Sequence, residues 1–207
     1  MTLLPLGAAG VLAFGAGGVL ADEGAHEDDV ACVATTNGTA PTTTGDDHGA
    51  DTRAITATAA DDHGTSGDDH VDGTSGDDHV QGQAGDDDIN GDQGDDDLCG
   101  DDGNDHLKGG AGNDNLTGGN GNDDIEGQSG ADHEFGDAGD DIVDGNAGND
   151  VIVGGAGRDH LNGGAGNDRI NARDGRKDVV TCGTGSDTVK ADKADVVAKS
   201  CEHVSRR

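Results

Sequence analysis

Residues 64–171 repeat a nine-residue pattern twelve times without an insertion or deletion. Numbered 1 to 9 from Gly64, positions 1 and 4 are glycine and position 6 is aspartate in all twelve units. Position 8 is Val, Ile or Leu in eleven of them. A fixed short period is typical of solenoids, in which each unit packs against its neighbours and equivalent residues recur at equivalent places. The period therefore predicts a stacked architecture with one carboxylate per unit in a constant position.

The composition excludes a conventional globular core. The chain of 207 residues has a formal net charge of -32, two Phe, and no Tyr or Trp. Such a composition usually indicates disorder, and only the strict period argues against disorder for residues 64–171. A polyanion of this density repels nucleic acids and anionic lipids, and it attracts cations. We therefore expect cations as partners, and no nucleic acid.

Within each unit, positions 1 to 6 are expected to form a turn and positions 7 to 9 a very short strand. Glycine at positions 1 and 4 permits backbone angles that a Cβ would forbid. Successive strand residues point to opposite faces, so the apolar residue at position 8 should point inward while its neighbours face water. The predicted core is Val71, Val80, Ile89, Leu98, Leu107, Leu116, Ile125, Val143, Ile152, Leu161 and Ile170.

Several units, such as GGAGNDNLT at 109 and GGAGNDRIN at 163, resemble the RTX (hemolysin-type) calcium-binding nonapeptide. The resemblance implies an all-β fold, a parallel β-roll or right-handed β-solenoid of nonapeptide repeats with a C-terminal cap. Two units would make one coil, so residues 18 apart would stack at the spacing of paired strands, about 4.8 Å. Position 2 departs from the family, because it is glycine in only four of the twelve units.

The resemblance also implies calcium ions between stacked turns, held by position-6 carboxylates and turn carbonyls, because hard cations take six to eight oxygen ligands. One edge of the roll would stack Asp69, Asp87, Asp105, Asp123, Asp141 and Asp159. The other edge would stack Asp78, Asp96, Asp114, Asp132, Asp150 and Asp168. Six carboxylates leave five gaps on each edge, which implies about ten ions. Asp168 would then be the last member of its stack.

The flanking segments have other characters. Residues 1–21 are apolar and small before an acidic segment, which is typical of a secretory signal peptide, although a basic residue is missing from its start. Residues 22–63 form an acidic, low-complexity linker that we expect to be disordered, with decayed repeats as the alternative. Residues 172–207 combine a degenerate repeat with cations and two cysteines, and we interpret them as the cap that a solenoid needs at its end.

Four cysteines in a secreted chain favour disulfides. Cys182 and Cys201 both lie in the predicted cap, and we expect them to be bonded. Cys32 and Cys99 are far apart in the sequence and have no obvious partners. They are either unpaired thiols or a bridge between the linker and the repeats.

Two features break the repeat or invite another metal. The unit that starts at Gly127 carries Glu134 at the inward position, followed by Phe135. Because a buried unpaired carboxylate is costly, we expect a local slip that turns Phe135 inward. Histidine occupies position 7 in five units, which suggests zinc. No two of these histidines are 18 residues apart, so solvated surface histidines are the favoured interpretation: His70, His79, His106, His133 and His160.

Enzyme signatures are missing from the sequence. His133-Glu134 does not extend to a His-Glu-x-x-His zinc protease motif, and no Gly-x-Ser-x-Gly elbow occurs. We therefore expect a non-enzymatic, secreted protein whose β-roll folds on binding calcium and has a structural or binding role outside the cell, without membrane insertion after signal cleavage. The alternatives are a repeat-bearing fragment of an RTX toxin, adhesin or exported hydrolase with its effector domain elsewhere, a calcium buffer or mineral-nucleating protein, and an unrecognised hydrolase. The sequence does not predict a protein or cell-surface partner.

Overall fold

The computed structural model describes residues 54–56 and 62–207. The predicted signal peptide, Cys32 and most of the predicted linker lie outside these described residues. All regular structure within the described ranges is β-strand, in eighteen short elements. No helix in the described part of the chain is long and apolar enough to cross a membrane.

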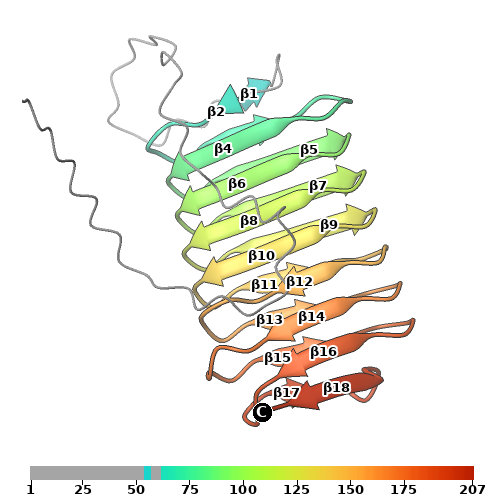
Figure 1. Ribbon diagram of the computed structural model, residues 1–207. Coiled ribbons are helices and arrows are strands. Elements are labelled where there is room, and N and C mark those ends of the chain that lie inside the picture. Colours follow the sequence, from blue (N-terminus) through green and yellow to red (C-terminus); the bar gives the residue numbers. More distant parts are fainter. Residues whose placement is uncertain (1–53, 57–61) are drawn as a thin grey trace, which may run out of the picture. The chain divides into compact units, whose positions relative to one another are not determined.

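The strands form two parallel sheets of nine strands each, with odd-numbered strands in one sheet and even-numbered strands in the other (Figure 1). The first sheet contains β1 (Ala54–Thr56), β3 (His70–Asp72), β5 (Asp88–Gln93), β7 (His106–Ala111), β9 (Asp124–Ser129), β11 (Ile142–Asp144), β13 (His160–Asn162), β15 (Val179–Thr181) and β17 (Val196–Val197). The second contains β2 (Asp62–His63), β4 (His79–Ala84), β6 (Asp97–Asp102), β8 (Asn115–Asn120), β10 (His133–Ala138), β12 (Val151–Val153), β14 (Arg169–Ala172), β16 (Thr188–Ala191) and β18 (His203–Arg206).

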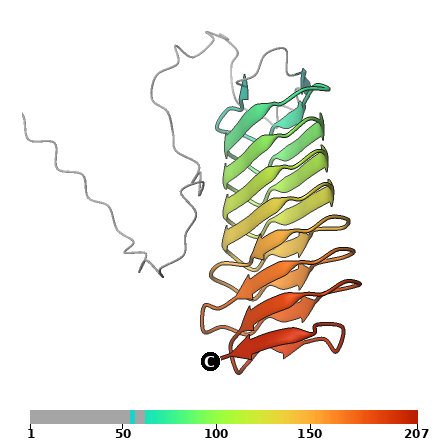
Figure 2. The ribbon, with the colours of Figure 1, turned by 45° about the vertical axis from the view of Figure 1, so that its right-hand side comes forward.

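This alternation makes a β-solenoid with two repeat units per coil, as Figure 2 shows from the side. In the repeats, each strand pairs with the strand two positions further along the chain. The register is 18 residues, for example between Ile89 of β5 and Leu107 of β7. The predicted all-β parallel solenoid is therefore confirmed. A parallel connection of this kind needs only a turn, because the chain enters the opposite sheet before it returns.

The core is a column of aliphatic side chains between the two sheets. All eleven predicted inward residues are buried, with exposed fractions of 0 to 2 %. They form one cluster that continues past the twelve regular units through Val180 and Val189. Position 8 therefore acts as predicted, since the middle residue of a three-residue strand has one face to itself.

The solenoid extends beyond the repeats at both ends. Within the range interpreted as linker, β1 pairs with β3 and β2 pairs with β4, so these five residues add to the first coil. At the other end, β15 to β18 continue both sheets. The register there changes from 18 to 19 residues, as between Ile170 and Val189, because one extra residue precedes Asp178.

The cysteines of the cap confirm their predicted pairing. Cys182 and Cys201 form a disulfide across 19 residues, with Cα atoms 5.2 Å apart. The bond joins the start of the last coil to the segment before β18. Cys99 of β6 is also disulfide-bonded, so the alternative of an unpaired thiol is wrong for this residue.

The expected slip at Phe135 does not occur. Glu134 pairs in normal register with Leu116 on one side and Ile152 on the other, and it is fully buried. Phe135 is only partly buried. A slip by one residue would turn every side chain of β10 to the opposite face and break its hydrogen bonds to both neighbouring strands. The penalty for one buried carboxylate is local, so the register holds and Glu134 enters the core.

Candidate metal centre

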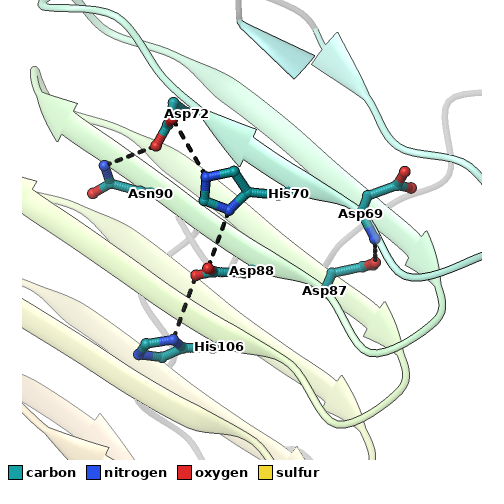
Figure 3. Close-up of polar contacts among 7 residues, drawn as sticks. All are labelled: Asp69, His70, Asp72, Asp87, Asp88, Asn90 and His106. Carbon is teal, nitrogen blue, oxygen red and sulfur yellow. Dashed lines mark hydrogen bonds and ion pairs between the residues drawn. The ribbon is translucent and has the colours of Figure 1, made fainter. Parts of the chain in front are cut away.

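The position-6 aspartates form two hydrogen-bonded columns. The backbone N–H of each aspartate donates to Oδ1 of the aspartate one coil further on, as Asp69 does to Asp87 (2.8 Å, Figure 3). We name the columns the first and the second ladder. The first ladder contains Asp69, Asp87, Asp105, Asp123, Asp141, Asp159 and Asp178. The second ladder contains Asp78, Asp96, Asp114, Asp132, Asp150, Asp168 and Asp187.

The other carboxylate oxygen of most ladder residues is buried and unsatisfied. Oδ2 has no hydrogen-bond partner in the described structure at Asp87, Asp96, Asp105, Asp114, Asp123, Asp132, Asp141, Asp150, Asp159, Asp168, Asp178 and Asp187. Buried polar atoms are nearly always paired, so a set of twelve orphans at equivalent positions indicates a missing ligand. Because each orphan is an anionic oxygen, that ligand must be a cation or a proton.

Carbonyl oxygens converge on the same places as these carboxylates. A Cβ built on Gly145 would lie 2.6 Å from Asp150 Oδ2 and 2.9 Å from the carbonyl oxygen of Gly163 in the next coil. The absence of a side chain at position 1 thus leaves a space faced by two oxygens from two coils. Paired carboxylate and carbonyl oxygens between stacked turns are the donor set that Ca²⁺ prefers.

The comparison with known families agrees with this chemistry. Three segments of the chain, residues 63–98, 100–134 and 135–170, match the RTX calcium-binding nonapeptide repeat. The chain belongs to the RTX calcium-binding nonapeptide repeat family. No curated protein matches it. RTX repeats bind calcium, and the orphaned Oδ2 atoms are where these residues fit the ion.

The RTX turns of this chain reach the required backbone shape without glycine at position 2. Six non-glycine residues have positive φ, all of them at position 2, for example Asp92 (74°) and Asn146 (63°). Asp and Asn tolerate this left-handed conformation better than most residues. The departure from the family pattern at position 2 therefore leaves the turns intact in units 3 to 12.

The first two units are different. Position 2 there is threonine, and its backbone and side chain donate hydrogen bonds to the carboxylate of the same unit. Thr65 N–H lies 2.5 Å from Asp69 Oδ2, and Thr74 N–H lies 2.6 Å from Asp78 Oδ2. The oxygens that would face a cation are thus already satisfied within the unit. Asp69 and Asp78 belong to the ladders, but only units further along the chain have free ligands.

The cap supplies the ladder residues that sequence reasoning missed. Asp178 and Asp187 accept the N–H groups of Asp159 and Asp168 at 3.0 Å, so Asp168 is not the last member of its ladder as predicted. The one-residue insertion hid Asp178, although the Val-Val-Thr strand that follows it has the usual pattern. The ladders end at Asp195 and Glu202, which accept the N–H groups of Asp178 and Asp187 respectively.

Burial makes the metal-free ladders electrostatically unfavourable. It raises the pKa of Asp105 and of Asp141 from 3.8 to about 7, with neighbouring carboxylates adding to the effect and the backbone N–H opposing it. The pKa of Asp87 and of Asp114 is raised to about 6, again mainly by burial. A carboxylate with a raised pKa favours a proton or another positive charge. A divalent cation between two ladder residues would supply that charge.

Each gap needs backbone ligands as well as carboxylates. No three Asp, Glu, His or Cys side chains within residues 62–207 gather into a ready-made metal cluster. Two carboxylates from adjacent coils fall short of six oxygens, so turn carbonyls must complete the shell. This requirement explains why the turn conformation matters as much as the aspartate.

The histidines lie outside this arrangement. On the outer face of the first sheet, Asp88 bridges His70 (3.1 Å) and His106 (3.4 Å), as Figure 3 shows. These side chains are between one third and one half exposed. The prediction that no two repeat histidines stack as direct neighbours is confirmed, because a carboxylate separates the two. Exposed pairs of this kind contribute little to stability.

Proposed function

We propose that calcium ions bind between successive members of each ladder and that their binding folds the chain. The observation that carries this proposal is the column of twelve buried Oδ2 atoms without a partner in the described structure. Without metal, each coil stacks a carboxylate on a carboxylate in a buried place. With metal, the same stacking becomes attractive, and the energy of binding becomes energy of folding.

The free oxygens place the ions one coil closer to the C-terminus than the sequence predicts. Six free carboxylates per ladder leave five gaps, from Asp87 to Asp178 in the first ladder and from Asp96 to Asp187 in the second. The resulting number is still about ten ions, at six to eight oxygen ligands each. The gaps next to Asp69 and Asp78 are filled last, because threonine already satisfies those carboxylates.

We infer further that the protein acts outside the cell, in a structural or binding role and without catalysis. Calcium modules of this class bind at about 10⁻⁴ to 10⁻³ M, which matches extracellular calcium. Folding would then follow export. The aspartates of the repeats are engaged in the ladders, and the repeats contain no known catalytic motif. The external partner would bind a rigid, strongly acidic surface.

Paired substitutions in one ladder test the metal assignment. Asp114→Asn should raise the calcium midpoint of folding about tenfold, because it removes a charged ligand from two gaps while it keeps an oxygen for the N–H of Asp96. Asp78→Asn is the matched control. It should change the midpoint less than about twofold, because Thr74 already satisfies that carboxylate. Equal midpoints for the two variants, measured by circular dichroism, would contradict the assignment.

A further inference from the structure

Glu134 is the one residue at position 8 that is not aliphatic, and its burial requires an explanation. It lies in β10, stacked between Leu116 and Ile152, with an exposed fraction of 0 %. Neither carboxylate oxygen has a hydrogen-bond partner among the described residues. An isolated carboxylate in an apolar core is strongly unfavourable, so a charged or protonated partner must compensate for it.

The carboxylate of Glu134 approaches the second ladder from the inside. A Cβ built on Gly127, the first residue of the same unit, would lie 2.6 Å from Glu134 Oε1 and 2.6 Å from Asp132 Oδ2. The equivalent point at Gly145 is faced by Asp150 Oδ2 and by the carbonyl oxygen of Gly163. In the unit of Gly127, an anionic oxygen from the core thus faces the place that a carbonyl oxygen faces at Gly145.

Two unpartnered carboxylates that converge on one buried point repel each other unless a cation lies between them. We propose that Glu134 is a direct ligand of the calcium ion held at Asp132, and that this ion is the most tightly bound in the roll. The inference rests on the proposed calcium function. Its physical reason is that calcium affinity rises with the number of charged ligands in the shell. Asp150 adds a further negative charge close to Glu134.

The structural alternative makes the opposite prediction. If Glu134 is only a protonated defect in the core, then Glu134→Leu restores the aliphatic column and should stabilise the roll at every calcium concentration. If Glu134 is a ligand, then the same substitution removes one charged oxygen from one site. Glu134→Gln retains the shape and polarity of the side chain and removes only the charge.

The experiment measures calcium binding by competition with a chromophoric chelator. Wild-type protein should show one ion bound about tenfold more tightly than the others. Both Glu134→Leu and Glu134→Gln should lose that tight class and keep the weaker ones. Leu116→Gln places a neutral polar group at the stacked position of the preceding coil, and this control should keep the tight ion.

Three results would overturn the inference: unchanged or tighter binding in Glu134→Leu, a single uniform class of sites in the wild type, or loss of the tight ion in Leu116→Gln. The last would show that any polar defect in the column acts alike. A wild-type chain that binds no calcium at all would instead contradict the proposed calcium function. The two levels of the account therefore fail in different ways.

Discussion

In excess chelator, lowering the pH from 8 to 5 is expected to increase the β-strand content of the chain. Burial raises the pKa of Asp105 and Asp141 to about 7 and that of Asp123 and Asp132 to about 6, against 3.8 for the unperturbed group. The folded state therefore binds more protons than the unfolded state. By linkage, this contribution to stability is fully present below about pH 4 and is lost as the pH rises through 6 to 7.

Protons thus replace part of what calcium supplies. Far-UV circular dichroism at pH 8 and pH 5 in chelator gives the measurement. The control is the same pair of spectra in saturating calcium, where acid should weaken the structure, because protons compete with the metal for the ladder carboxylates. Identical spectra at the two pH values in chelator would show that ladder repulsion does not limit folding.

Deleting residues 172–207 is expected to raise the calcium needed for folding by at least about tenfold. The deletion removes β15 to β18, which cover the ends of both sheets. It removes Asp178 and Asp187, which accept the N–H groups of the preceding ladder residues. It also removes the disulfide and eight of the twelve Lys and Arg residues, which offset part of the negative charge. A solenoid coil needs a formed neighbour, so loss of the capped end should impair folding of every unit before it.

The matched control deletes residues 22–63. This variant loses β1 and β2, but the next coil begins with carboxylates that Thr65 and Thr74 already satisfy. We expect its calcium midpoint to change by less than about twofold. Both variants carry Cys99→Ser, so that they share one cysteine state in the repeats. Similar midpoints for the two deletions, measured by circular dichroism during calcium titration, would show that the cap is not the folding nucleus.

The sequence alone predicts the central part of this structure because the signal repeats twelve times. A fixed nine-residue period determines which residue of each strand points inward, and the eleven predicted core residues are all buried. The same period determines that aspartates 18 residues apart stack, as Asp114 and Asp132 do. Each unit confirms the others, so an error in one unit does not change the architecture.

The sequence fails where a single residue departs from the period. One inserted residue before Asp178 concealed the continuation of both ladders into the cap. Glu134 was expected to leave the core, but the hydrogen bonds of β10 to both neighbouring strands are worth more than one favourable side chain. The hydrogen bonds from Thr65 and Thr74 depend on backbone angles at position 2, which composition does not reveal.

The central claim is that calcium, and not the apolar column alone, folds the repeats. Its most direct test is far-UV circular dichroism of the whole chain at pH 8, first in excess chelator and then with increasing calcium, with magnesium as the parallel control. The account predicts a largely unfolded spectrum in chelator and a cooperative rise of β structure at about 10⁻⁴ to 10⁻³ M calcium, but not with magnesium. A spectrum that is already β-rich in excess chelator at pH 8 would contradict it.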